Sequence, residues 1–215
     1  MNKINFSIYF IFLMISLGKS QSFIKADKIL LPNVRFDCMP FIDSLGYHCF
    51  ENIEISKYYY IHRKIDLDLN LDEKKDIIII LNPEFQQKFG IPTVNSCFEK
   101  SKRLFVLCLG RKDGFIIDVV NENLILNIYD YNEDPFSDLS ISADGFKLKF
   151  EFGSIINYDI DFFFSRMNGK VYLTHKRQLC FSADGGSRII EKKFPFQKFF
   201  LVSSVNLIDL IDECE

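Results

Sequence analysis

Two strand patterns with a charged turn between them, at residues 65–81, restrict the fold most strongly. Residues 65–71 alternate between aliphatic and polar side chains, which places the aliphatic residues on one face of a strand and the polar residues on the other. Residues 72–76 form a charged turn. Residues 77–81 are a mostly β-branched run that is too short for a helix. The pattern predicts two neighbouring antiparallel strands, and one face of the first strand is expected to be exposed to solvent.

Further short strands with turn residues between them are indicated along the rest of the chain. Asn168-Gly169, between two apolar runs, is a strong hairpin signal because both residues tolerate the positive φ of a type I′ turn. No convincing amphipathic helix of three turns appears, and residues 205–211 have a spacing that fits either state. We therefore expect an all-β fold, an antiparallel sandwich or barrel. The additional strands are expected at residues 104–109, 115–120, 124–129, 146–152 and 158–162.

The N-terminus has the three-part pattern of a cleavable signal peptide. Lys3 gives the positive start, residues 6–17 are apolar or small, and residues 18–22 offer small side chains for cleavage. An N-terminal membrane anchor is the alternative, but a run of about twelve residues is shorter than the roughly twenty that span a bilayer. We therefore expect a secreted, extracellular protein with no membrane span after cleavage, since the later apolar stretches are strand-sized. The expected boundaries are residues 1–22 for the signal peptide, 23–44 for an N-terminal extension and 45–215 for one domain.

All six cysteines lie after the expected cleavage point, and an even number in an oxidising compartment predicts disulfides. Sequence alone leaves many pairings open. Two pairs share the same spacing of ten intervening residues, which suits local links across hairpin-like turns and leaves the last two cysteines for each other. The suggested pairs are Cys38–Cys49, Cys97–Cys108 and Cys180–Cys214.

Composition and motifs argue against several classes of function. The net charge of −3 is small and the basic residues are dispersed, so nucleic acid is not an expected partner. No C-x₂-C pair exists and His48, His62 and His175 stand far apart, so no metal site is expected. Gly185-Gly186-Ser187 lacks the G-x-S-x-G frame of a nucleophile elbow, and the paired carboxylates occur at strand spacing, where a solvated sheet face is the ordinary interpretation. We predict that the protein is not an enzyme and has neither catalytic residues nor a cofactor.

The order of several segments resembles the galectin family over about residues 45–211. Residues 76–85 are similar to the strand that carries the family's H-x-N-P-R-F motif, since Asn82, Pro83 and Phe85 match it. The later segments follow in the order that the family shows. They are residues 94–96 (V-x-N-S), 133–136 (E-x-R and Pro-Phe), 146–152 and the hairpin at 168–170.

This resemblance implies an antiparallel jelly-roll β-sandwich of the concanavalin A-like, galectin-like kind. The cysteines predict that this sandwich is stapled by disulfides, in which it departs from typical galectins. The resemblance also implies a carbohydrate-binding groove, in which polar side chains select sugar hydroxyls and an aromatic ring packs on the apolar face of the sugar. Ile80 stands in place of the family's His and Glu84 in place of its first Arg, and the chain has no tryptophan. We therefore expect an eroded galactoside site, with glycans or extracellular glycoproteins as partners. The residues assigned to the groove are Asn82, Glu84, Asn95 and Glu133.

Other interpretations of the same residues remain open. Turn and strand-end chemistry also accounts for Asn82-Pro83 and for Asn95. A secreted interaction protein would use the protein surface of the sandwich instead, including the long segment around residues 115–131. An unrecognised hydrolase would require acidic or histidine side chains that converge in a cleft.

Overall fold

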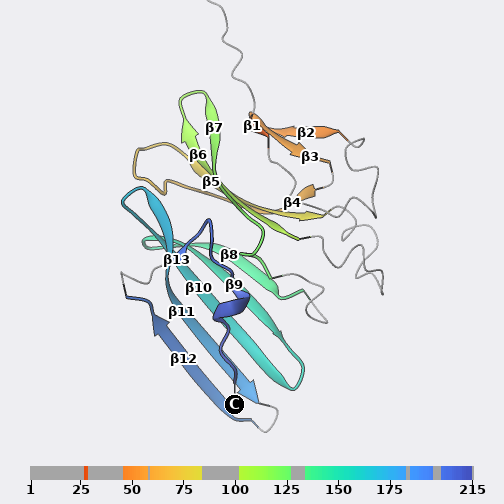
Figure 1. The fold of residues 1–215 in the computed structure, drawn as a ribbon, viewed down its shortest axis with the longest axis vertical. Helices are drawn as coiled ribbons and strands as arrows, with labels where there is room; N and C mark the ends of the chain where they lie inside the picture. Colours follow the sequence, from red (N-terminus) through yellow and green to blue (C-terminus); the bar gives the residue numbers. More distant parts are fainter. Residues whose placement is uncertain are drawn as a thin grey trace, which may run out of the picture.

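The structure is a computed structural model, and it describes residues 27–28, 46–57, 59–83, 102–126, 134–182, 185–195 and 200–214. The expected signal peptide, residues 1–22, lies outside the described residues, and only β1 is described within the expected N-terminal extension, residues 23–44. Apart from a 3₁₀ helix at Ile208–Leu210, the elements of this part of the chain are strands (Figure 1). They are β1 (Asp27–Lys28), β2 (Tyr47–Phe50), β3 (Ile53–Ser56), β4 (Tyr59–Leu67), β5 (Asp76–Pro83), β6 (Leu104–Arg111), β7 (Gly114–Asn121), β8 (Phe136–Ser142), β9 (Gly145–Gly153), β10 (Ile156–Met167), β11 (Lys170–Ser182), β12 (Ser187–Lys193) and β13 (Phe200–Leu201).

The described strands form three sheets, which we name A, B and C. Sheet A has the order β1-β3-β2, sheet B the order β4-β5-β6-β7, and sheet C the order β12-β11-β10-β9-β8, with β13 paired to β11. Apart from the parallel β1–β3 pair, neighbouring strands are antiparallel, which confirms the expected all-β antiparallel fold. Neighbours along β4 to β7 and along β8 to β12 are also consecutive in the sequence. Within the described residues these two runs lack the crossovers of a jelly roll, so the galectin-like strand arrangement stays a prediction.

Sheets B and C pack face to face, and the side chains between them form the larger hydrophobic core. Successive side chains of a strand point to opposite faces, so every second residue of a strand enters this core. In β5 these residues are Ile78 and Ile80, and in β6 they are Phe105 and Leu107. Sheet C contributes large aromatic and aliphatic residues from β9 and β10 in the same way. They are Phe146, Leu148, Phe150, Ile160, Phe162 and Phe164.

The central strands of sheet B, β5 and β6, are buried on both faces, which explains the uninterrupted apolar run of β5. Ile77, Ile79 and Leu81 point away from sheet C and pack against Ile53 and Ile55 of β3 in sheet A. A strand with two covered faces needs no polar residue at alternate positions, so the whole isoleucine run is buried. The small sheet A is therefore a third layer on the sandwich, with a second hydrophobic core beneath it (Figure 1).

The first hairpin of sheet B turns earlier than the alternation predicts. The predicted strand at residues 65–71 is wrong beyond Leu67, where β4 ends. The carboxylate of Asp68 accepts hydrogen bonds from the backbone N–H groups of Asp72 and Glu73, at 3.1 and 3.0 Å. These bonds stabilise a loop in place of the strand, because an aspartate that caps nearby backbone groups competes with sheet pairing.

Two other local expectations are resolved by the backbone. Asn168 and Gly169 have φ angles of 50° and 76°, so the hairpin between β10 and β11 is confirmed. Residues 205–211, which fit either state, contain a single 3₁₀ turn at Ile208–Leu210. No helix in the described part of the chain is long and apolar enough to cross a membrane.

The predicted strand at residues 124–129 is wrong over its described part, because residues 124–126 are buried in the core without pairing to a strand. Asn121 turns the chain at this point. Its Oδ1 accepts a hydrogen bond from the backbone N–H of Asn123 at 2.7 Å, and its Nδ2 donates to the carbonyl of Val202 at 2.6 Å. The segment is therefore held by side-chain contacts instead of a ladder.

One suggested disulfide is present and another is not. Cys180 in β11 is bonded to Cys214 near the C-terminus, with their Cα atoms 5.9 Å apart, which confirms this pair. Cys49 carries an exposed free thiol, so the suggested Cys38–Cys49 bond is not formed. Cys108 is buried in β6. The suggested partners that lie outside the described residues are Cys38 and Cys97.

Candidate binding site at the junction of sheets B and C

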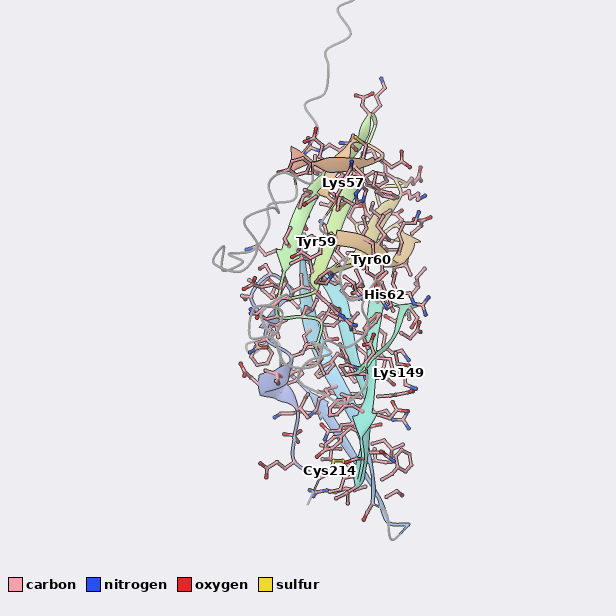
Figure 2. The ribbon with its side chains drawn as sticks, turned by 90° about the vertical axis from the view of Figure 1, so that its right-hand side faces the viewer. Lys57, Tyr59, Tyr60, His62, Lys149 and Cys214 are labelled. Atoms are coloured by element: carbon pink, nitrogen blue, oxygen red, sulfur yellow. A yellow bond between two sulfur atoms is a disulfide. The ribbon has the colours of Figure 1, made fainter. Side chains whose placement is uncertain are left out.

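Polar side chains gather where the beginning of β4, the end of β5 and the beginning of β6 meet the beginning of β8. We name this set the junction cluster, and it consists of Tyr60, His62, Asn82, Arg103 and Asp134. Figure 2 places Tyr60 and His62 at the level where sheet B gives way to sheet C. The cluster therefore lies at one end of the interface between the two sheets.

Strand register brings the sheet B members of the junction cluster together. Asn82 lies opposite Tyr60 in the β4–β5 ladder, and by alternation it faces sheet C, as Ile80 does. Leu81 pairs with Leu104 in the next ladder, so Arg103 follows on as the neighbour of Asn82. These polar residues continue the core-facing stripe of sheet B beyond its last apolar members.

Arg103 and Asp134 form a two-bond ion pair that joins the two sheets. The Nη1 and Nη2 atoms of Arg103 donate to the two carboxylate oxygens of Asp134 at 2.7 and 2.6 Å. The Arg103 side chain is only 1% exposed, whereas Asp134 is one-third exposed. The Asp134 carboxylate also accepts a hydrogen bond from the backbone N–H of Phe136 at 3.0 Å, which fixes it at the start of β8. This geometry holds the guanidinium in one orientation.

Two buried polar atoms of the junction cluster have unused hydrogen-bonding capacity. Asn82 is 2% exposed, and its Nδ2 donates to the hydroxyl oxygen of Tyr60 at 3.3 Å. The Oδ1 of Asn82 and the Nε of Arg103 are enclosed and make no hydrogen bond in the part of the chain that the structure describes. Because nearly all buried polar groups in proteins are paired, an unpaired acceptor and an unpaired donor in one cluster need an explanation.

His62 has an unusual position in the junction cluster because it is the extra residue of a β-bulge in β4. Its ring lies between two aromatic rings, with centroids 6.3 Å from Tyr60 and 5.7 Å from Phe136. Burial lowers the pKa of His62 from its ordinary value of 6.5, and the charge of Arg103 lowers it further, while the charge of Asp134 acts in the opposite direction. His62 therefore favours the neutral form.

The lowered pKa of His62 gives a prediction about pH. Above about pH 6.5 the histidine is neutral in both the folded and the unfolded chain, so it contributes nothing to stability there. Below that value the unfolded chain binds a proton that folded His62 resists, so we expect the free energy of unfolding to fall as the pH is lowered. His175, whose pKa burial also lowers, has the same sign. Urea unfolding at about pH 7.5 and about pH 5.5 measures the fall. His62→Gln should reduce it, and an unchanged fall in this variant would contradict the assignment.

Of the four residues that the sequence assigns to a sugar groove, one is among the residues that the structure describes. Asn82 belongs to the junction cluster, while Glu84, Asn95 and Glu133 lie outside the described residues. Ile80, which stands where the galectin family has its His, is a buried core residue.

Sequence reasoning missed the other four members of the cluster. The sequence points to His62 only as a possible zinc ligand, and it indicates no site role for Tyr60, Arg103 and Asp134. A usable signal was the charged Arg103 directly before the apolar run at residues 104–109, because an arginine at the start of a buried strand needs a partner.

The function of the cluster is indicated neither by a set of metal ligands among the described residues nor by a similar protein. Among the described residues, no group of three or more His, Cys, Asp or Glu side chains is arranged to hold a metal ion. Comparison of the chain with protein-family models, curated proteins and solved structures returned no match.

Proposed function

We propose that the junction cluster binds a saccharide and that the protein is a secreted glycan-binding protein. The observation that carries this proposal is the pair of enclosed atoms with unused capacity, the acceptor Oδ1 of Asn82 and the donor Nε of Arg103. A sugar hydroxyl is a donor and an acceptor at once, so a single hydroxyl, or two adjacent ones, would satisfy both atoms. Because both atoms are enclosed, binding requires a local opening of the cluster.

The other members of the junction cluster supply the remaining properties of a sugar site. Asp134 holds the Arg103 guanidinium in place before a ligand arrives, which lowers the ordering cost of binding. The rings of Tyr60, His62 and Phe136 lie next to these polar groups and offer apolar surface for the C–H face of a sugar. A few fixed polar groups beside aromatic surface are typical of small-molecule sites.

Two further observations support the proposal. Asn82 is shared with the galectin-like pattern, and His62 and Arg103 provide the side-chain types that the family has at the positions of Ile80 and Glu84. The disulfide between β11 and the C-terminus supports an extracellular location, because disulfides persist in oxidising compartments.

A glycan array with the oxidised chain tests the proposal, with galactosides as one arm. Asn82→Leu removes the acceptor while nearly preserving size. We expect about a threefold to tenfold loss of affinity for the best glycan, as for one lost hydrogen bond. We expect a thermal midpoint close to that of the wild type, because an unsatisfied buried oxygen is removed as well.

Asn157→Leu, at an exposed position of β10, is the matched control and should bind as the wild type does. Absence of binding to every glycan would refute the proposal. That result would favour the alternative, a secreted module that binds other proteins.

A further inference from the structure

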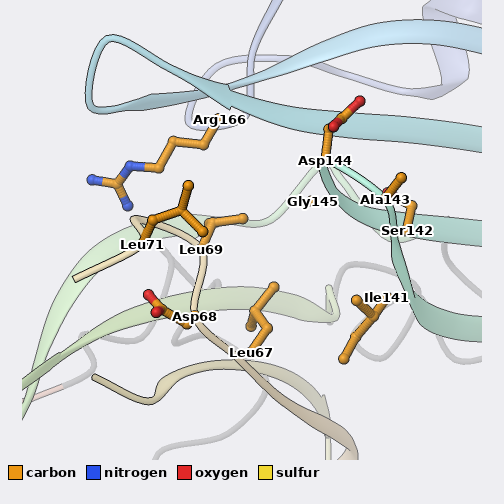
Figure 3. A pocket seen from close by; sticks show the side chains of 10 residues that line it. All are labelled: Leu67, Asp68, Leu69, Leu71, Ile141, Ser142, Ala143, Asp144, Gly145 and Arg166. Carbon is orange, nitrogen blue, oxygen red and sulfur yellow. The ribbon is translucent and has the colours of Figure 1, made fainter. Parts of the chain in front are cut away.

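A second candidate site lies at the opposite end of the interface between sheets B and C. Figure 3 shows a hollow between the loop that follows β4 and the turn that joins β8 to β9, with Arg166 of β10 on one side. Its volume of about 380 Å³ is near the lower end of the range for small-molecule sites. The junction cluster is at the first residues of β8 and this hollow at the last, so the two sites are separate.

The hollow is flanked by apolar side chains that the fold leaves in water. Leu71 is 87% exposed and Ile141 is 60% exposed, and they approach the hollow from the two sheets. Leu67 and the buried Leu69 continue this aliphatic surface inward. Exposed apolar residues that are scattered singly need no explanation, but two that flank one hollow with an aliphatic floor indicate a binding surface.

The backbone at Leu71 adds an independent observation. Its φ angle is 58°, in the left-handed region that suits glycine and that a leucine side chain rarely adopts. A strained backbone and a solvent-exposed aliphatic side chain both oppose leucine at this position when only the fold is considered. Such strain is commonly retained at ligand sites.

Among the described residues that line the hollow, Arg166 provides the only cationic group. Its Nη2 donates to the carbonyl of Gly169 at 3.1 Å. Its Nη1 is enclosed and makes no hydrogen bond within the described residues, so its donors become available to another group when the side chain turns towards the hollow. In Figure 3 the guanidinium lies on the same side as Leu71, at the edge of the aliphatic surface.

The two acidic residues of the lining do not occupy this donor. The carboxylate of Asp68 is engaged by the backbone N–H groups of Asp72 and Glu73. Asp144 is exposed, and its side chain extends away from Asp68 and from the centre of the hollow in Figure 3. An arginine with unused donors next to aliphatic surface matches a ligand with an anionic head and an aliphatic body.

We infer that this hollow binds a small amphiphilic carboxylate. The carboxylate accepts hydrogen bonds from the Arg166 guanidinium, and the aliphatic chain covers Leu67, Leu69, Leu71 and Ile141. We assign this ligand to the free medium-chain fatty acids. The exposure of Leu71 is then explained, because its apolar surface is removed from water when the ligand binds.

Calorimetric titration of octanoate into the full chain, below the micelle-forming concentration, tests the inference. We expect saturable binding of octanoate, binding about tenfold weaker or more for octanol, which lacks the charge, and none for octylammonium. N-acetyl-leucyl-leucine also carries a carboxylate next to aliphatic side chains, so it tests whether the ligand is the C-terminus of a peptide instead. Tighter binding of the peptide than of octanoate would overturn the choice of fatty acids as the source.

Two variants locate the binding. Arg166→Gln should weaken octanoate binding about tenfold or more, while the matched control Arg177→Gln, on the half-exposed outer face of sheet C, should have no effect. Leu71→Gly should weaken binding but leave the thermal midpoint equal or higher, because glycine relieves the left-handed backbone. Octanoate affinity that Arg166→Gln leaves unchanged would overturn the inference.

Discussion

Replacement of Asp134 by alanine is expected to lower the free energy of unfolding by about 3 kcal/mol. The variant leaves the Arg103 guanidinium, which is 1% exposed, without the carboxylate that pairs with it. An unpaired buried charge is far more costly than the pair was favourable, since the pair itself bears a large desolvation penalty. We place the effect at the lower end of the usual range because Asp134 is one-third exposed, so water reaches this side of the pair.

Urea unfolding measures this loss, and two further variants make it specific. Asp138→Ala removes a partly exposed carboxylate from β8, the strand that Asp134 precedes, and its effect should stay within about 0.5 kcal/mol. The double variant Arg103→Met with Asp134→Ala should recover part of the loss, because no charge is then left buried. If the double variant is less stable than Asp134→Ala alone, the cost does not come from an uncompensated guanidinium.

The pKa of His62 reports on the same pair by a different measurement. Asp134 raises this pKa and Arg103 lowers it, so the two single substitutions should move it in opposite directions. We expect the pKa to fall further in Asp134→Ala and to rise in Arg103→Met. Titration of the His62 ring by NMR distinguishes this electrostatic effect from a loss of stability that leaves the pKa unmoved.

Strands β5, β6, β9 and β10 could be predicted because each of them has at least one core face. The alternation at residues 146–152 and the positive-φ pair Asn168-Gly169 are local signals, and both describe the structure correctly. The layer arrangement could not be predicted. Residues 77–81 show that β5 is buried, but a run of isoleucines does not say that sheet A covers one face and sheet C the other.

The candidate site could be predicted only at Asn82, whose Asn-Pro context at a strand end is visible in the sequence. His62 is hidden because a bulge at this residue breaks the period of two, so alternation assigns it to no face. Arg103 and Asp134 are 31 residues apart, and their contact depends on how sheets B and C are packed. The same packing decides which side chains meet at the hollow around Arg166.

A second buried cation, Lys176, holds the C-terminal segment against sheet C. Lys176, in β11, is completely buried, and its ammonium group donates to Gln178 Oε1 at 3.0 Å, to the Leu210 carbonyl at 2.7 Å and to Asp212 Oδ2 at 2.5 Å. Burial lowers the pKa of Lys176, and the hydrogen bond to Asp212 opposes this shift. Three acceptors use all the donors of an ammonium group, so the segment closes over Lys176 without an unpaired N–H. The Cys180–Cys214 bond fixes the end of this segment.

Replacement of Cys214 by serine is therefore expected to lower the free energy of unfolding by about 2–4 kcal/mol. The disulfide closes a loop with a sequence separation of 34 residues, and its loss restores the freedom of that loop in the unfolded chain. The segment should also exchange its amide hydrogens faster in the variant, because only the Lys176 network then holds it. Cys49→Ser, at an exposed free thiol, is the matched control, with an expected effect within about 0.5 kcal/mol. Urea unfolding of the oxidised proteins measures both values, and equal stability of Cys214→Ser and the wild type would show that hydrogen bonds alone secure the C-terminus.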